Sequence, residues 1–225
     1  MSKVKLTING TQVSGREGMT ILEVAQENGI DIPTLCYSPD LRPIGACRIC
    51  VVEVEGSRLL VGSCHTPIAP EMVIQTHSPR VLEARKVILE LLFGSHCGSC
   101  MLCNKANVCN LRSIAADLEV GLPRFQLRKR FHPIEDVSPY VQRDLTKCVL
   151  CWRCIRACQE IAKQSVYATG YRGFDSKVIV DCDVPLDKEV CRDCGICITY
   201  CPTGALTRPT KLGKEKPGKS LVITK

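Results

Sequence analysis

The feature that most constrains this chain is a doubled run of cysteines in its C-terminal third. The two runs are Cys148-x2-Cys151-x2-Cys154-x3-Cys158 and, offset by 43 residues, Cys191-x2-Cys194-x2-Cys197-x3-Cys201-Pro202. Runs with this spacing bind [4Fe–4S] clusters, and in a doubled run the fourth cysteine of each binds the other run's cluster. We therefore predict two ligand sets: Cys148, Cys151, Cys154 and Cys201 (the Cys148 set), and Cys191, Cys194, Cys197 and Cys158 (the Cys191 set).

The same spacing carries a local structural expectation. A C-x2-C-x2-C loop curls around three corners of a cubane cluster, and we expect the fourth cysteine to begin a helix that points away toward the other site. Pro202 suits a first helical turn, whereas Gln159 stands at the equivalent position of the first run. A structural zinc site is the alternative, but a doubled run of this kind is typical of iron–sulfur proteins rather than zinc proteins.

A second group of four cysteines lies near the N-terminus. Cys36, Cys47, Cys50 and Cys64 (the Cys36 set) follow the pattern C-x10-C-x2-C-x13-C. Four thiolates on a compact loop can bind a [2Fe–2S] cluster, and the small residues Gly45 and Ala46 allow the backbone to wrap closely around it. A zinc site or buried free thiols would be the alternatives, but zinc sites usually come as two close C-x2-C pairs.

A third group combines a histidine with cysteines. His96, Cys100, Cys103 and Cys109 (the His96 set) follow the pattern H-x3-C-x2-C-x5-C. Imidazole can replace a thiolate at one iron, and it brings less negative charge. The neighbouring Cys97 leaves an all-cysteine set open, with Cys97 in place of His96.

The spacing of the Cys36 set departs from the plant-type pattern C-x4-C-x2-C. It resembles instead the [2Fe–2S] module at the start of the large iron–sulfur subunit of respiratory complex I, which also occurs in NAD-reducing and [FeFe]-hydrogenases. The His96 pattern resembles the [4Fe–4S] motif of the same family, which has one histidine and three cysteines. The resemblance covers about residues 1–209, and it is strongest to the diaphorase iron–sulfur subunit of bidirectional NAD-reducing [NiFe]-hydrogenases.

The resemblance implies an α+β fold with three cluster-binding parts. These are an N-terminal β-grasp [2Fe–2S] ferredoxin domain, a helical His/Cys-ligated [4Fe–4S] segment and a C-terminal two-cluster bacterial-ferredoxin-like domain. We expect them at residues 1–80, 81–121 and 139–209, with a basic connector at 122–138 and a charged tail at 210–225.

Hydrophobic patterning predicts the main elements of the first two parts. Alternating apolar residues indicate a strand over 4–8, followed by an Asn9-Gly10 hairpin turn and a returning strand over 11–14. Thr20 and Glu23 fit a capping box that opens a helix through Asn28. We expect further strands at 51–54, 59–61 and 72–76, and a helix over 81–93 with Ser78 as its N-cap and Pro79 in its first turn.

The composition indicates the cellular compartment and bears on whether the protein binds nucleic acid. The count of 17 cysteines is odd, and no signal peptide or membrane-spanning apolar run is visible, so we expect a cytoplasmic protein. The formal net charge of +7 treats every cysteine as neutral. Four bound clusters would contribute about −7, so the basic excess is mostly compensation for cluster charge and only weak evidence for nucleic acid. Cys97 and Cys182 remain unassigned, and we expect Cys182 to be a partly buried free thiol.

No catalytic residues are predicted. The sequence shows no Gly-rich dinucleotide fingerprint, no P-loop, and no recognisable flavin, molybdenum or nickel site. We therefore expect a non-catalytic electron relay in a multisubunit NAD(P)-linked oxidoreductase. The resemblance implies two partners: a flavin-containing NAD(P)H-binding subunit and a catalytic subunit such as a hydrogenase or formate dehydrogenase. A stand-alone multi-cluster carrier is the alternative, and a redox-sensing regulator that binds nucleic acid through Arg124–Arg130 is a distant one.

Overall fold

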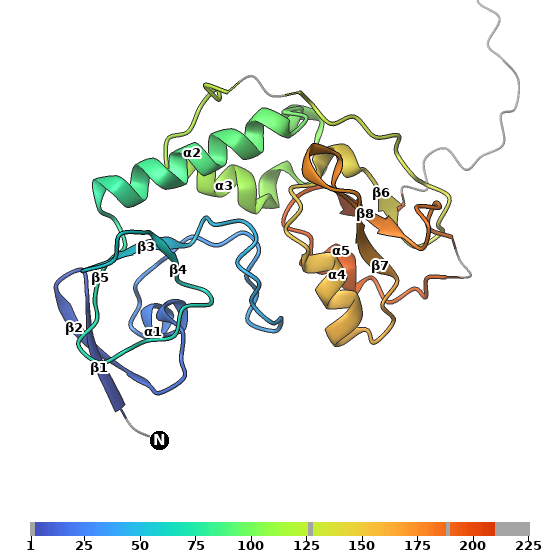
Figure 1. Cartoon of the computed structure of the whole chain (residues 1–225). Coiled ribbons are helices and arrows are strands. Elements are labelled where there is room, and N and C mark those ends of the chain that lie inside the picture. Colours follow the sequence, from blue (N-terminus) through green and yellow to red (C-terminus); the bar gives the residue numbers. More distant parts are fainter. Residues whose placement is uncertain (1–2, 126–127, 188–189, 210–225) are drawn as a thin grey trace, which may run out of the picture.

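The structure is a computed structural model that describes residues 3–125, 128–187 and 190–209. A five-stranded mixed sheet forms its N-terminal part (Figure 1), in the order β2-β1-β5-β3-β4. Strands β1 (Lys3–Ile8) and β2 (Thr11–Arg16) form the predicted hairpin, and both Asn9 and Gly10 have the positive φ of a type I′ turn. Strand β5 (Val73–Gln75) runs parallel to β1 and antiparallel to β3 (Val51–Val54).

Helix α1 (Ile21–Glu27) packs its apolar side into the same core as this sheet. The capping box is confirmed, since the Thr20 hydroxyl accepts from the Glu23 backbone N–H while the Glu23 carboxylate accepts from the Thr20 N–H at 2.7 Å. The strand predicted over 59–61 is shorter than expected. Only β4 (Val61–Gly62) forms, because the Ser57 side chain bonds the backbone of Leu59 and turns the chain, leaving Leu59 exposed.

Two helices form the middle of the chain and lie side by side in Figure 1. Helix α2 (Pro79–Ser95) begins as predicted, with the Ser78 hydroxyl accepting from the Val81 N–H. The single turns η1 (Cys100–Leu102) and η2 (Ala106–Val108) lead to α3 (Asn110–Asp117). Leu89 of α2 and Leu111 of α3 share a core with Leu35 and Ile49, so this part packs directly on the N-terminal loops.

The C-terminal part contains two small hairpins and two short helices. Strand β6 (Gln142–Arg143) pairs with β9 (Leu206–Thr207), and β7 (Tyr167–Gly170) pairs with β8 (Lys177–Val180). The helices are α4 (Arg153–Arg156), continued by the π turn η4 (Ala157–Ile161), and α5 (Ile196–Tyr200). The short turns η3 (Leu145–Lys147) and η5 (Gly173–Asp175) complete it.

Two local expectations for this part were wrong. The fourth cysteine of each run does not begin a helix. Trp152 and Gly195 adopt left-handed backbone conformations and act as N-caps, so each helix starts one residue before the third cysteine and the fourth follows near its end. Cys182 is exposed rather than partly buried, because β8 ends at Val180 and the chain turns through residues 181–183.

The predicted charged tail, 210–225, lies outside the described residues, as do two residues of the basic stretch. No helix within the described ranges has the length and apolar character needed to span a membrane.

Candidate metal centres

The Cys36 set is brought together as two pairs. The backbone N–H of Cys36 donates to Sγ of Cys47 at 3.3 Å, and the N–H of Cys47 donates to Sγ of Cys36 at 3.5 Å. The side chains of Cys50 and Cys64 form the second hydrogen-bonded pair. In each pair the partner thiol lowers the pKa of one member, Cys36 or Cys50, which favours a thiolate. Two adjacent thiol pairs with backbone N–H donors suit a two-iron cluster.

A buried cation lies beside this set. Arg85 of α2 is fully buried, and its Nη2 donates to the Val51 carbonyl at 2.8 Å, but its Nε and Nη1 have no partner in the protein. Burial lowers the pKa of Arg85 to about 10, and the Cys50 thiolate opposes this. An unpaired buried cation is costly unless negative charge lies nearby. A cluster of net negative charge at the Cys36 set fits this environment.

The His96 set lines one cavity. His96, Cys100, Cys103 and Cys109 all face it, and so does Cys97, so the structure leaves the choice between His96 and Cys97 open. His96 is buried, and the backbone N–H of Gly98 donates to its Nδ1 at 3.2 Å. Burial, followed by the charge of Lys129, lowers the pKa of His96 and keeps the imidazole neutral, which is the metal-binding form.

The Cys148 set lines a second, apolar cavity together with Trp152 and Leu206. Burial raises the pKa of Cys148 to about 11 and that of Cys151 to about 12. The backbone N–H of Leu150 donates to Sγ of Cys148 at 3.4 Å. The buried guanidinium of Arg143 acts electrostatically on Cys148, and its Nε has no partner. Such desolvated thiols beside a buried cation are suited to a bound positive iron–sulfide core, which would hold them as thiolates.

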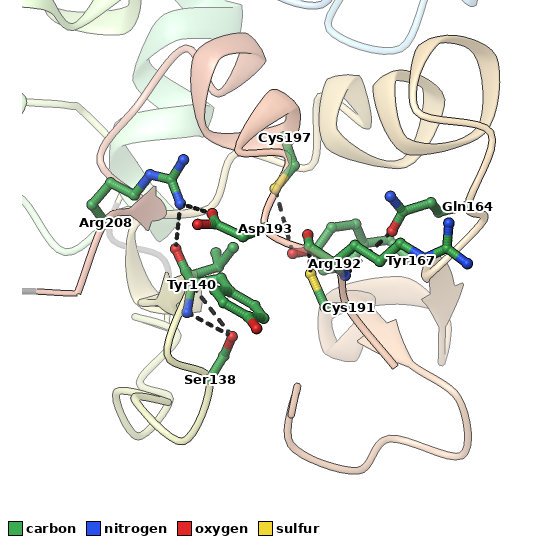
Figure 2. A network of polar contacts seen from close by, with 10 residues as sticks. Ser138, Tyr140, Gln164, Tyr167, Cys191, Arg192, Asp193, Cys197 and Arg208 are labelled. Carbon is green, nitrogen blue, oxygen red and sulfur yellow. Dashed lines mark hydrogen bonds and ion pairs between the residues drawn. The ribbon is translucent and has the colours of Figure 1, made fainter. Parts of the chain in front are cut away.

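The Cys191 set is held together by the loop before α5 and by η4. Cys191 interacts electrostatically with the other three thiols of this set, and Cys197 interacts with Cys194 and Cys158. The N–H of Val166 donates to Sγ of Cys158 at 3.3 Å, and the hydroxyl of Tyr167 lies 3.6 Å from Sγ of Cys197 (Figure 2). Cys194 is exposed to solvent, unlike its three partners.

Gly195 shapes the rim of this site. Its φ is +66°, and a Cβ there would lie 2.5 Å from Nη2 of Arg208. Arg208 pairs with Asp193 and donates to the carbonyl of Tyr140 (Figure 2), and its side chain is about half exposed. The left-handed backbone conformation favours glycine at this turn, although Trp152 adopts a similar conformation before α4.

The Cys148 set shares a neighbouring residue with each of the other three sets. Thr203 lines both its cavity and that of the His96 set, and a Cβ at Gly204 would lie 2.8 Å from Sγ of Cys103. Tyr167 interacts electrostatically with both Cys154 and Cys197, and so connects the Cys148 set to the Cys191 set. Arg153 is within electrostatic reach of Cys151 on one side and of Cys36 and Cys47 on the other.

In the part of the chain that the structure describes, no three His, Cys, Asp or Glu side chains converge as they would around a single metal ion. An iron–sulfur cluster distributes its protein ligands over two or more irons.

Three families match successive parts of the chain. Residues 1–79 match a 2Fe-2S iron-sulfur cluster binding domain, and residues 85–124 match the NADH-ubiquinone oxidoreductase-G iron-sulfur binding region. Residues 138–207 match the ferredoxin-like domain of NADH-quinone oxidoreductase subunit 3. The chain is thus a mixed α+β protein with a 2Fe-2S domain and 4Fe-4S binding regions, as the sequence predicts at that level.

Two curated relatives are similar over most of this chain. The NADP-reducing hydrogenase subunit HndD of Solidesulfovibrio fructosivorans is 40% identical over 212 residues, which is 92% of this chain and 36% of that one. The NADH-ubiquinone oxidoreductase 75 kDa subunit of Reclinomonas americana is 34% identical over 204 residues, 91% of this chain and 29% of that one. The chain thus spans about a third of the length of these relatives.

One solved structure is similar to this chain over nearly the whole length of both chains. A chain of an NAD+-reducing [NiFe]-hydrogenase in the H2-reduced state superposes with a TM-score of 0.81 and 28% identity, covering 96% of this chain and 91% of that one.

Proposed function

Because the chain is a homologue of HndD and of the 75 kDa subunit of NADH-ubiquinone oxidoreductase, we propose that it is the electron-transfer iron–sulfur subunit of a multisubunit NAD(P)-linked oxidoreductase. It relays single electrons between a flavin-containing, NAD(P)H-oxidising subunit and a catalytic subunit of the hydrogenase or formate dehydrogenase type. The observation that supports this proposal is that the Cys148 set shares a neighbouring residue with each of the other three sets, as expected for a continuous path through the chain.

Each set has a proposed occupant. The Cys36 set holds a [2Fe–2S] cluster, and the His96, Cys148 and Cys191 sets each hold a [4Fe–4S] cluster. When bound, these groups supply one-electron acceptors and donors. The protein residues provide the thiolates, the N–H donors to sulfur and the buried cations that offset the added negative charge.

The proposal divides the chain into three cluster-binding parts and a connector. Residues 1–80 form a β-grasp [2Fe–2S] domain, 81–121 the His/Cys-ligated segment, and 139–209 the two-cluster ferredoxin-type domain, joined by the connector at 122–138. The sheet order with β1 and β5 parallel, and the repeated left-handed N-caps before α4 and α5, support this division.

Two surfaces suit exchange with partner subunits. At the Cys191 set, Cys194 is an exposed residue. At the His96 set, the apolar side chains of Met101, Leu102 and Val108 are exposed on the turns that carry the cysteines. Exposed apolar side chains grouped beside a redox site are typical of a subunit interface. We place this subunit in the cytoplasm, where its many thiols stay reduced.

The basic stretch is largely used within the chain. The guanidinium of Arg124 binds the carboxylates of Glu90 and Glu83 on α2, and Nζ of Lys129 donates to the carbonyls of Phe93 and His96 at 2.8 Å. These contacts pin the connector along α2, and they remove two of the cations that a nucleic-acid-binding regulator would need.

The partners can be identified by purifying the native protein anaerobically. Mass spectrometry of the purified complex should detect a flavin-containing subunit and a second oxidoreductase subunit. A stable monomer of 24.8 kDa that exchanges electrons freely would favour the stand-alone carrier instead.

A further inference from the structure

Two arginines of α4 join the C-terminal part to the loop of the Cys36 set. Arg153 begins the helix and Arg156 ends it, and Cys154 of the Cys148 set lies between them. Arg156 is buried and Arg153 half-buried. Both side chains thus leave a helix that carries a predicted ligand and reach a loop more than 110 residues earlier in the chain.

The arginines contact the backbone of that loop rather than its side chains. Nη2 of Arg156 donates to the carbonyl oxygen of Cys36 at 2.6 Å, and its Nη1 donates to the carbonyl of Arg42. Nη2 of Arg153 donates to the carbonyl of Tyr37. Two further hydrogen bonds join the same two parts of the chain. The N–H of Arg42 donates to Glu160, and the hydroxyl of Tyr200 donates to Asp40.

Neither arginine has a carboxylate partner among the hydrogen bonds and ion pairs of the described residues. The Nε atoms of both are buried without a partner. The charges that face them are thiols: Cys151, Cys36 and Cys47 act on Arg153, and Arg156 acts on Cys36. Two cations packed between two sets of thiolates, and paired with no acid, are placed to offset charge on both sets at once.

We propose that Arg153 and Arg156 form a cationic bridge that holds the Cys36 loop against the Cys148 set and favours the reduced state at both sites. They are positioning residues, and the inference rests on the proposed function. An electron added to either site increases its negative charge, and a fixed cation nearby stabilises that charge. Arg156 acts mainly on the [2Fe–2S] site, because its contacts are to Cys36 and Arg42, whereas Arg153 acts on both sites.

The test is an anaerobic redox titration of the full chain, monitored by electron paramagnetic resonance, in Arg156→Met, Arg153→Met and Arg156→Lys. In Arg156→Met we expect the equilibrium constant for one-electron reduction of the [2Fe–2S] site to fall about tenfold. This corresponds to a reduction potential about 59 mV lower than in the wild type. Arg153→Met should lower the potentials of both the [2Fe–2S] site and the Cys148 site. Arg156→Lys, which keeps the charge, should leave the [2Fe–2S] potential close to the wild-type value.

A matched control and a second readout separate this role from a merely structural one. Arg16→Met removes an exposed arginine that pairs with Glu27 in the same N-terminal part, and it should shift neither potential. Hydrogen exchange of residues 36–42 should quicken in both methionine variants, even where cluster content falls. If the variants keep their paramagnetic resonance signals but their potentials do not shift, the proposed cationic bridge is wrong while the proposed function stands. If the wild-type chain itself shows no [2Fe–2S] signal, the proposed function is wrong as well.

Discussion

The hydroxyl of Tyr167 lies 3.6 Å from Sγ of Cys197 (Figure 2), and Tyr167 also interacts electrostatically with Cys154 of the Cys148 set. Tyr167 is almost fully buried on β7. Burial, reinforced by the nearby thiolates, raises its pKa, so the phenol stays protonated and can donate to sulfur. The same hydrogen bond lowers the pKa of the Cys197 thiol against the stronger effect of burial. Tyr167 is therefore a donor to one predicted cluster ligand and a neighbour of the other set.

Replacing Tyr167 with phenylalanine should lower the reduction potential of the Cys191 site. A donor to cluster sulfur stabilises the reduced state, and a hydrogen bond of about 1 kcal/mol corresponds to roughly a fivefold change in the one-electron equilibrium. A redox titration of the Tyr167→Phe variant measures this. Tyr171→Phe, on the same hairpin but bonded to Asp183, is the control and should leave the potential unchanged. An equal shift in both variants would contradict the assignment.

His96 and Cys97 line the same cavity, and separate substitutions decide between them. We expect His96→Ala to lose one [4Fe–4S] cluster, so that iron falls by about four atoms per chain. Cys97→Ala should keep its full iron content. Iron analysis of both purified variants is sufficient, and loss of the cluster in Cys97→Ala alone would show that the site is all-cysteine.

Arg85 should lower the free energy of unfolding of the protein when the clusters are absent. After anaerobic chelation of iron, its Nε and Nη1 have no hydrogen-bond partner and the negative charge of the cluster is gone, which leaves only the weaker influence of Cys50 and Asp31. We expect the Arg85→Met variant of the apo-protein to be as stable as the wild type or more stable, by about 1–4 kcal/mol. In the loaded protein the same variant should lower the potential of the [2Fe–2S] site. Chemical denaturation of both forms, with Arg85→Lys as the matched control, checks this. A loss of stability in the apo-protein would contradict it.

Glu90 and Arg124 should hold the connector on α2. Three hydrogen bonds of 2.7–2.9 Å from Arg124 lower the pKa of the buried Glu90 carboxyl. Because that pKa lies below the unfolded value of about 4.3, the stabilisation is complete at pH 7 and is lost only as the pH falls through the lowered pKa. Glu90→Gln should therefore destabilise the protein at pH 7.

Glu83→Gln is the control for that pair, since Glu83 is exposed and makes one contact with Arg124. It should lower the midpoint of thermal unfolding less than Glu90→Gln does. Equal midpoints for the two variants would show that the buried carboxylate has no special role.

The cysteine spacing indicates which thiols lie close together, because residues within three positions of each other share a loop whatever the rest of the fold does. That these thiols bind clusters stays a prediction. The hairpin at Asn9-Gly10 and the capping box at Thr20 were predictable for the same reason, since each depends on neighbouring residues. The start of α4 was not, because it depends on the left-handed conformation of Trp152, for which a non-glycine residue gives no signal.

The buried arginines were also missed. Arg85, Arg153 and Arg156 read as ordinary helix-surface cations, and their partners are backbone carbonyls between 34 and 120 residues away. A carbonyl acceptor leaves no trace in the identity of the residue that carries it. A clue lay in the charge balance, because a +7 chain with many thiolate ligands must place some cations close to its clusters.

Anaerobic analysis of iron and labile sulfide in the purified chain tests whether one protein of this size holds all four clusters. One [2Fe–2S] and three [4Fe–4S] clusters give about 14 iron and about 14 sulfide per chain. A value near 10 would remove one [4Fe–4S] site, and a value near 4 would contradict the four-site path altogether.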